Sequence, residues 1–218
     1  MEFPVIRHYS SLLPILLCLL LFGATTTVLS APEIWIATRS DGKTGSGTSA
    51  DPFDAHTALL FDQIMRSLAP STILHIGPGL FHTSGSYSFN ESNGYYLPVG
   101  CKIIGAGIDR TTVRVIAYPA AAGINGHYVF ESKANVDGAG IEVTDLTVDC
   151  NWQNLTAVAA AKTGAVSLHG NNCAIRRVRA INAYGNWASL AEAFVLNISE
   201  RAKNGGAGVG LLEVYNLH

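Results

Sequence analysis

The spacing of hydrophobic positions changes from helical to alternating near residue 70. Between residues 55 and 68 apolar side chains recur three and four positions apart, which predicts an amphipathic helix with Asp54 as its N-cap and Pro70 beyond its end. We expect its buried side to consist of Ala58, Leu59, Phe61, Ile64, Met65 and Leu68. A short strand is predicted over 34–37. The segment TILHIGPGLF predicts another strand, with a tight turn at Gly77-Pro78-Gly79.

Beyond this segment, short strand-like runs recur between glycine, asparagine and aspartate residues. One family of runs comprises CKIIGAG, YVFES, AVSLHGN and AFVLNIS, and a second family, alternating with it, comprises TTVRVIA, DLTVDCN, RVRAINA and LEVYNLH. The second family begins near Thr111, Asp145, Arg177 and Glu213, so the repeat is a little over thirty residues long. Runs that repeat in this way, each pairing in parallel with its own copy, predict a solenoid.

The segment GAVSLHGNNCAIRRVRAINAYGN contains one run of each family, with a GNN break between them. A hairpin is the alternative interpretation, but it would leave the matching pattern of the other runs unexplained. We therefore interpret AVSLH and AIRRVRAIN as successive strands of one solenoid repeat.

Because alternate residues of a strand face opposite sides, the aligned runs predict columns of side chains. In the first family the inward columns are Ile104, Phe130, Leu168 and Leu196, and Lys102, Tyr128, Val166 and Phe194, where Lys102 fits badly. In the second family they are Val113, Leu146, Val178 and Val214, followed two places later by Val115, Val148 and Ala180. The outward columns then place Glu131 beside His169, Arg114 in line with Arg179, and Asp149 diagonally near Arg179.

Residues 1–30 differ in kind from the rest of the chain. Arg7 and His8 precede the apolar block LLPILLCLLLFGA, and small residues lead to Ala31. This layout is typical of a secretory signal peptide, so we expect a secreted, cell-surface or periplasmic protein. An uncleaved membrane anchor is the alternative. The block is shorter than the roughly 20 apolar residues that a span needs and contains Pro14, so we expect no stable membrane span after cleavage.

Composition and net charge limit the kinds of fold and binding partner that the sequence favours. Apolar residues make up 48% of the chain, charged residues only 14%, and there are 22 glycines, which suits strands and tight turns. The net charge of −2 gives no basic footprint for a nucleic acid, and we expect a monomer. Without the signal peptide three cysteines remain. A Cys150–Cys173 disulfide and buried single cysteines, Cys101 among them, are both compatible with the sequence.

Four segments resemble the N-terminal part of proteins of the pectin-lyase-like superfamily: SDGKTGSGTSADPF, ILHIGPGLFHTSG, LPVGCKIIGAGIDRTTVRV and IEVTDLTVDCN. The resemblance covers roughly residue 34 to the end, and it implies an all-β, right-handed parallel β-helix with an N-terminal capping helix. We expect an entry segment with that helix and the first strands over 31–96, and β-helix repeats over 97–218. The sequence ends within a strand and shows no capping segment, so we expect a chain truncated at its C-terminus.

The lyases of that superfamily resemble one another in using an Arg or Lys base, often with a calcium ion that neutralises a uronate carboxylate. Abstraction of the proton beside a carboxylate builds negative charge, which a cation must stabilise. By this resemblance Arg177 and Arg179 are candidates for the cationic role, and calcium is a candidate cofactor, with oxygens from Glu142, Asp145 and Asp149. We assign no metal site. The sequence contains neither a clear lyase motif nor the paired aspartates of polygalacturonase-type hydrolases.

The candidate site residues follow from the outward columns and from aromatic residues near loops. The predicted catalytic residues are Asp149, Arg177, Arg179, His169 and Glu131, and the predicted substrate-binding residues are Trp152, Arg114 and Tyr184. Each of them also has a structural interpretation, such as a solvated strand face for the arginines and a turn residue for His169.

We expect a secreted polysaccharide lyase or glycoside hydrolase that acts on an extended glycan, because stacked strands offer a long face rather than a closed pocket. Two alternatives stay open. One is a non-catalytic β-helix that binds glycans or serves as an adhesin, and the other is an inactive fragment.

Overall fold

The computed structural model describes residues 30–85, 94–117, 127–132, 140–154, 163–169, 171–183, 196–199 and 211–214. Within these residues the chain is mostly strand, with one α-helix, α2 (Ala58–Ser67), and one short 3₁₀ turn, η1 (Trp152–Asn154). The sequence prediction of a largely β protein with one helix after its first strand agrees with this. Among the described residues, no helix has both the length and the apolar character needed to cross a membrane.

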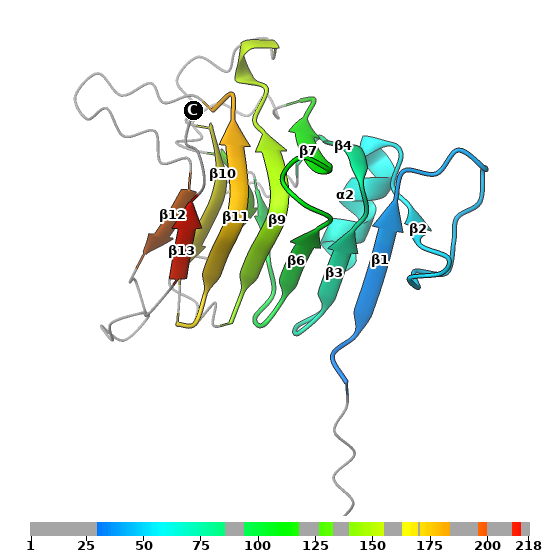
Figure 1. The fold of residues 1–218 in the computed structure, drawn as a ribbon, viewed down its shortest axis with the longest axis horizontal. Helices are drawn as coiled ribbons and strands as arrows, with labels where there is room; N and C mark the ends of the chain where they lie inside the picture. The colour runs from blue at the N-terminus through cyan, green and yellow to red at the C-terminus, as the bar shows by residue number, and fades with distance from the viewer. Residues whose placement is uncertain are drawn as a thin grey trace, which may run out of the picture. The chain divides into compact units, whose positions relative to one another are not determined.

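The strands form three rows of parallel neighbours (Figure 1). The first row contains β1 (Glu33–Ala37), β3 (Ile73–Ile76), β6 (Lys102–Gly105), the first parts of β9 (Glu142–Asp149) and β11 (Ala174–Ile181), and β13 (Leu211–Val214). The second row contains β4 (Gly79–Thr83), β7 (Thr111–Val115) and the last parts of β9 and β11. The third row contains β5 (Tyr95–Tyr96), β8 (His127–Glu131), β10 (Thr163–His169) and β12 (Leu196–Ser199). The short strand β2 (Phe53–Asp54) pairs with β1.

The chain visits the first, second and third rows in turn and then returns to the first. Strands that neighbour each other in a row therefore come from successive passages of the chain, as in a solenoid. The hairpin interpretation of residues 164–186 is wrong, because β10 pairs with β8 and β12 whereas β11 pairs with β9 and β13.

The first and second rows belong to one curled sheet that bends at Asp145 in β9 and at Arg177 in β11. Both residues have a left-handed backbone, with φ of 60° and 46°, which is uncommon outside glycine. Before the bend β9 pairs with β6, and after it β9 pairs with β7. A Cβ on Gly105 would collide with the carbonyl oxygen of Asp145, so the neighbouring passage can approach the bend only through a glycine.

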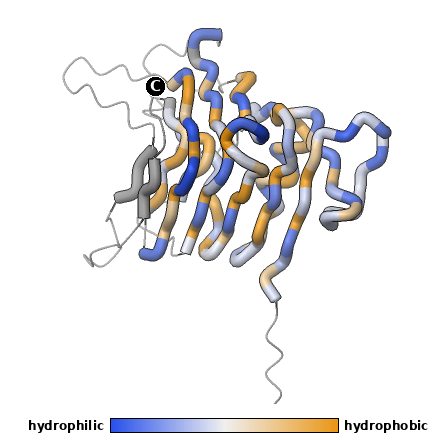
Figure 2. The backbone as a smooth tube through the Cα atoms, in the orientation of Figure 1, coloured by the Kyte–Doolittle hydropathy of each residue, from blue (hydrophilic) through white to orange (hydrophobic). Residues whose placement is uncertain are grey.

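Hydrophobic and polar residues alternate along the strands of the first row, as Figure 2 shows. The buried hydrophobic side chains of the strands form one core cluster. Part of the predicted register is confirmed: Val178 pairs with Leu146 and Val214, and Ala180 pairs with Val148. Elsewhere the prediction is wrong. Val113 pairs with Val148 instead of Leu146, and Phe130 pairs with Val166 instead of Leu168. Strand β6, which contains Lys102 and Ile104, lies in the first row between β3 and β9 and not beside β8. A shift by two residues keeps the same face inward, so alternation alone does not fix the register.

Helix α2 begins later than predicted. Its N-cap is Thr57, whose hydroxyl accepts a hydrogen bond from the backbone N–H of Leu60. The predicted cap, Asp54, instead accepts hydrogen bonds from the backbone N–H groups of Arg39 and His56. The predicted buried face holds at Phe61 and Met65, but Leu59 is 63% exposed.

The three cysteines of residues 31–218 are buried as thiols, which agrees with the second of the two alternatives. The Cys150–Cys173 disulfide is wrong. Cys173 precedes β11 and Cys150 follows β9, so the two lie at opposite ends of a pair of strands that are each eight residues long. A disulfide requires Cα atoms within about 7 Å.

Candidate functional site

The outward side of the second row gathers the described polar candidates. Its register forms two columns, one of Leu80, Thr112, Thr147 and Arg179 and the other of His82, Arg114, Asp149 and Ile181. Each column takes one residue from each of four neighbouring strands, so side chains far apart in sequence lie about 4.8 Å from one another at the backbone. We call this surface the second-row face.

On the second-row face, the Asp149 carboxylate accepts three hydrogen bonds. The side chain is 2% exposed and accepts a hydrogen bond from Arg114 Nε at 2.7 Å. The backbone N–H of Asn151 and the side-chain amide of Asn182 donate to the other carboxylate oxygen at 3.0 and 2.7 Å. The Arg114 side chain itself is 41% exposed, so a buried anion fixes a cation at the surface. In this structure Asp149 positions the Arg114 side chain. The catalytic role predicted for Asp149 stays a prediction.

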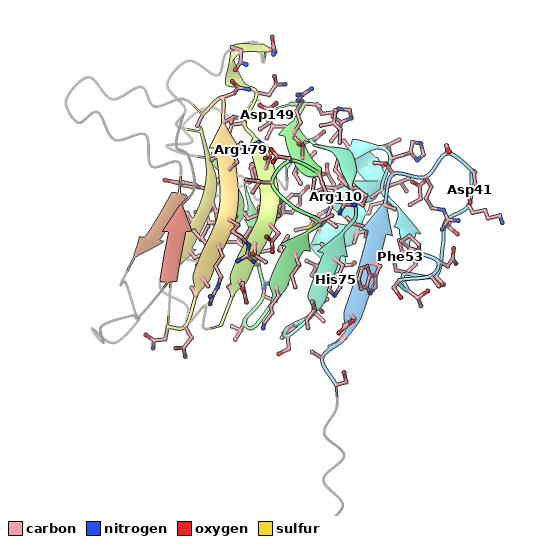
Figure 3. All side chains as sticks on the ribbon, viewed as in Figure 1. Asp41, Phe53, His75, Arg110, Asp149 and Arg179 are labelled. Atoms are coloured by element: carbon pink, nitrogen blue, oxygen red, sulfur yellow. The ribbon has the colours of Figure 1, made fainter. Side chains whose placement is uncertain are left out.

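The loop between β6 and β7 folds over the same face. Its Gly107 N–H donates to the Asp145 carbonyl at 2.8 Å, and its Ile108 carbonyl accepts from the Thr147 hydroxyl at 2.5 Å. Arg179 donates from Nη1 to the loop's Asp109 at 2.6 Å. In the register Arg179 lies diagonally from Asp149, as predicted, and Figure 3 labels both residues. The Arg179 guanidinium nevertheless pairs with Asp109, which the strand alignment could not include because Asp109 is a loop residue.

Arg177 and Asp145 form a bidentate pair at the bend of the sheet. Arg177 Nε and Nη2 donate to the two carboxylate oxygens of Asp145 at 2.5 and 2.8 Å, and Nη2 also contacts the Thr144 hydroxyl at 3.2 Å. The hydrogen bonds from Arg177 outweigh the effect of burial and lower the pKa of Asp145. Both residues occupy left-handed positions, so the pair joins two successive bends.

Of the remaining predicted site residues, Glu131 and His169 belong to the third row, on β8 and β10. Glu131 is 8% exposed and pairs in register with Ser167, whereas His169 pairs with Ser199, so the predicted Glu131–His169 neighbourhood is wrong. The cause is again a two-residue shift between β8 and β10. Trp152 begins the turn η1, and Tyr184 lies outside the described residues.

The predicted calcium ligands do not converge. Asp145 is paired with Arg177, Asp149 with Arg114, and Glu142 lies 3.3 Å from Arg176 and 3.7 Å from Lys102. The described residues contain no group of three or more His, Cys, Asp or Glu side chains placed to hold a metal ion. This donor set does not fit calcium, and we derive no step through a metal.

Sequence reasoning missed a stacked pair on the outward side of the first row. The rings of Trp35 and His75 lie parallel, with centroids 3.8 Å apart and planes at 9°. Glu33 lies 3.7 Å from His75 Nε2. The signal was present in the runs EIWIA and ILHI, where burial of Ile36, Leu74 and Ile76 places the residues between them outward.

Neither a family model nor a curated protein matches the sequence. Among solved structures, the chain is similar to the A-module of the mannuronan C-5 epimerase AlgE6 from Azotobacter vinelandii, with a TM-score of 0.41 and 18% sequence identity. The similarity covers 52% of this chain and 30% of the epimerase chain, so it spans under a third of that protein. An activity has to be argued from the site itself.

Proposed function

We propose that this protein is a right-handed parallel β-helix of the pectin-lyase-like kind that binds an extended acidic polysaccharide along its second-row face. The observation that carries the proposal is the arrangement of Arg114 on Asp149. A buried carboxylate engages only the Nε of this arginine among the described residues, and the guanidinium stays at the surface. Its terminal nitrogens are then available for a carboxylate ligand.

A second arginine on the same face supports an acidic ligand. Arg179 is 29% exposed and, within the described part of the chain, uses only Nη1, for Asp109. Guanidinium groups bind carboxylates through two parallel hydrogen bonds, and cations that recur from strand to strand suit a polymer with recurring charges.

Secretion and catalysis are part of this proposal. Residues 1–30 support export, and the Arg–carboxylate chemistry of the face supports a lyase or hydrolase. A non-catalytic binding module is the second candidate. It is favoured by the engagement of Asp149 in three hydrogen bonds, which leaves this carboxylate poorly placed to exchange a proton.

The test measures binding of polygalacturonate and polymannuronate to the purified chain by calorimetry at low salt, with a neutral glucan for comparison. Arg179→Ala should weaken binding of the acidic polymers by roughly tenfold, which is about 1.4 kcal/mol. Arg66→Ala removes the same charge from the exposed side of α2 and should leave affinity unchanged. Arg114→Lys keeps a charge beside Asp149 and should weaken binding because it lacks the bidentate geometry.

Equal binding of acidic and neutral polymers, or equal losses in Arg179→Ala and Arg66→Ala, would refute the acidic-glycan face. Product analysis then separates the activities. An ultraviolet-absorbing unsaturated uronate indicates a lyase, and new reducing ends without that absorbance indicate a hydrolase. Tight binding without either product supports the binding module.

A further inference from the structure

A pocket of about 350 Å³ lies between the loop 42–44, strand β2 and helix α2. On the helix it is lined by Leu60, Gln63, Ile64 and Ser67, which recur three and four residues apart and so share one side. The other side of the helix, with Phe61 and Met65, packs into the core. Figure 3 labels Phe53 at this end of the strand rows, away from Asp149 and Arg179.

Phe53 gives the pocket a fixed aromatic wall. The residue is partly buried and packs against the core. A Cβ on Gly47, which has a φ of 79°, would overlap the Phe53 ring, so the backbone of residue 47 lies directly against that ring. The ring is therefore held from the loop side, and Leu60 and Ile64 continue the apolar wall.

Polar side chains also line the pocket, among them Asp54, Lys43 and Gln63. Asp54 lines the pocket with an 8% exposed side chain. One carboxylate oxygen accepts from the backbone N–H groups of Arg39 and His56, and the other lies 2.5 Å from His56 Nδ1. Burial acts to raise the pKa of Asp54, but the hydrogen bonds from His56 and Arg39 outweigh it and lower the pKa. The carboxylate is thus an ionised acceptor at neutral pH, and Lys43 and Gln63 add donors.

We propose that this pocket binds one neutral sugar ring. An aromatic wall for the apolar face of a ring, combined with carboxylate, amide and ammonium groups for its hydroxyls, fits that chemistry, and the volume lies at the small end for ligand sites. Asp54 and Lys43 bring opposite charges to the pocket, so neither an acidic nor a basic sugar is favoured over a neutral one, and an apolar ligand would cover Lys43 and Gln63 without offering them hydrogen-bond partners. The site shares no residue with the second-row face, so it goes beyond the proposed function.

The experiment is ligand-observed NMR titration of the full chain with a neutral methyl hexoside, the matching uronic acid and cyclohexanol. A single ring supports only weak binding, so we expect a dissociation constant on the order of 1 mM for the neutral sugar. Gln63→Trp fills the pocket and should weaken binding at least about tenfold, whereas Arg66→Trp places the same side chain outside it and should change affinity less than about twofold. Gln63→Ala, which opens the pocket while removing the amide, should weaken binding without filling it.

Equal effects of Gln63→Trp and Arg66→Trp, or binding of cyclohexanol as strong as that of the sugar, would overturn the inference. Preference for the uronic acid would overturn it as well. The result is separable from the test of the second-row face, because Arg179→Ala should leave hexoside binding unchanged while Gln63→Trp should leave polymer binding unchanged.

Discussion

At the scale of single residues, the arginines of β11 join successive passages of the chain. Arg177 and Arg179 pair with Asp145 and Asp109, both of which precede them by more than thirty residues. Arg176 lies 3.3 Å from Glu142 on the neighbouring strand. Exposed ion pairs of this kind contribute little stability, about 0–1 kcal/mol. These pairs instead fix the orientation of the charged side chains, and the pair with Asp109 holds the Arg179 guanidinium where a ligand could contact it.

His75, on the outward side of the first row, should show a titration that reports its burial. Burial lowers its pKa below the ordinary value of 6.5, and the nearby carboxylate of Glu33 partly opposes this. Glu33→Gln should therefore lower the pKa of His75 further, as measured by NMR titration of the imidazole protons. Because the folded-state pKa is depressed, the neutral form is favoured by folding. The associated stability is complete above 6.5 and is lost as the pH falls through the folded-state value.

Glu142→Gln is the matched control for this titration. Glu142 lies two strands from β3 in the same row and pairs with Lys102, so its neutralisation should leave the His75 midpoint in place. A His75 midpoint at or above 6.5 in the wild type, or no difference between the two variants, would contradict the burial argument.

At the scale of elements, the buried carboxylate of Asp62 links helix α2 to the strands through hydrogen bonds. Asp62 is 4% exposed and accepts hydrogen bonds from the Thr83 hydroxyl at 2.8 Å, the Tyr95 hydroxyl, and the backbone N–H of Ser84 at 3.2 Å. Three donors thus converge from β4, β5 and the residue after β4. Burial is the main cause of the raised pKa of Tyr95, and its hydrogen bond to Asp62 adds to it.

Asp62→Asn tests this attachment. The amide NH₂ would lie either against the Ser84 backbone N–H, which can only donate, or against the Thr83 and Tyr95 hydroxyls, which would have to turn from donors to acceptors. Either arrangement loses the hydrogen bonds to a charged carboxylate, at a cost of about 1–3 kcal/mol in the free energy of unfolding. Urea denaturation measures the loss. Asp109→Asn is the control, because Asp109 is 74% exposed and its pair with Arg179 should contribute less than about 1 kcal/mol. Equal stability of Asp62→Asn and the wild type would show that the network does not hold the helix.

Sequence patterns predicted which elements form, because alternation and helical spacing are local properties. They could not predict Asp62, since its partner Tyr95 lies 33 residues away and a polar residue on a helix usually faces water. The start of α2 was misplaced because Asp54 accepts from Arg39 and His56 instead of capping the helix. Of the candidate site, the diagonal relation of Asp149 to Arg179 was predicted, whereas the contact of Arg114 with Asp149 required a register that the alternation leaves open.

At the scale of the whole molecule, stacking converts sequence repeats into a surface with regular spacing. Arg114 and Arg179 are separated by two strand spacings and by two residues along the strands, which places their backbones roughly 12 Å apart. Neither the residue nor the element alone creates this distance. It arises because four passages of the chain stand side by side in the second row.

This spacing predicts a dependence on oligomer length. For a series of acidic oligosaccharides from disaccharide to octasaccharide, affinity should rise steeply until the ligand reaches across the roughly 12 Å between the two arginine positions, and should then level off. Raising the salt concentration should weaken binding of the long oligomers most, because exposed charges are screened over about 8 Å at physiological ionic strength. Arg179→Ala should flatten the length dependence, since only one cation would remain to be reached, whereas Arg66→Ala should preserve it. A wild-type affinity that does not change with length, or an equally steep rise in Arg179→Ala, would show that the two arginines do not contact one polymer together.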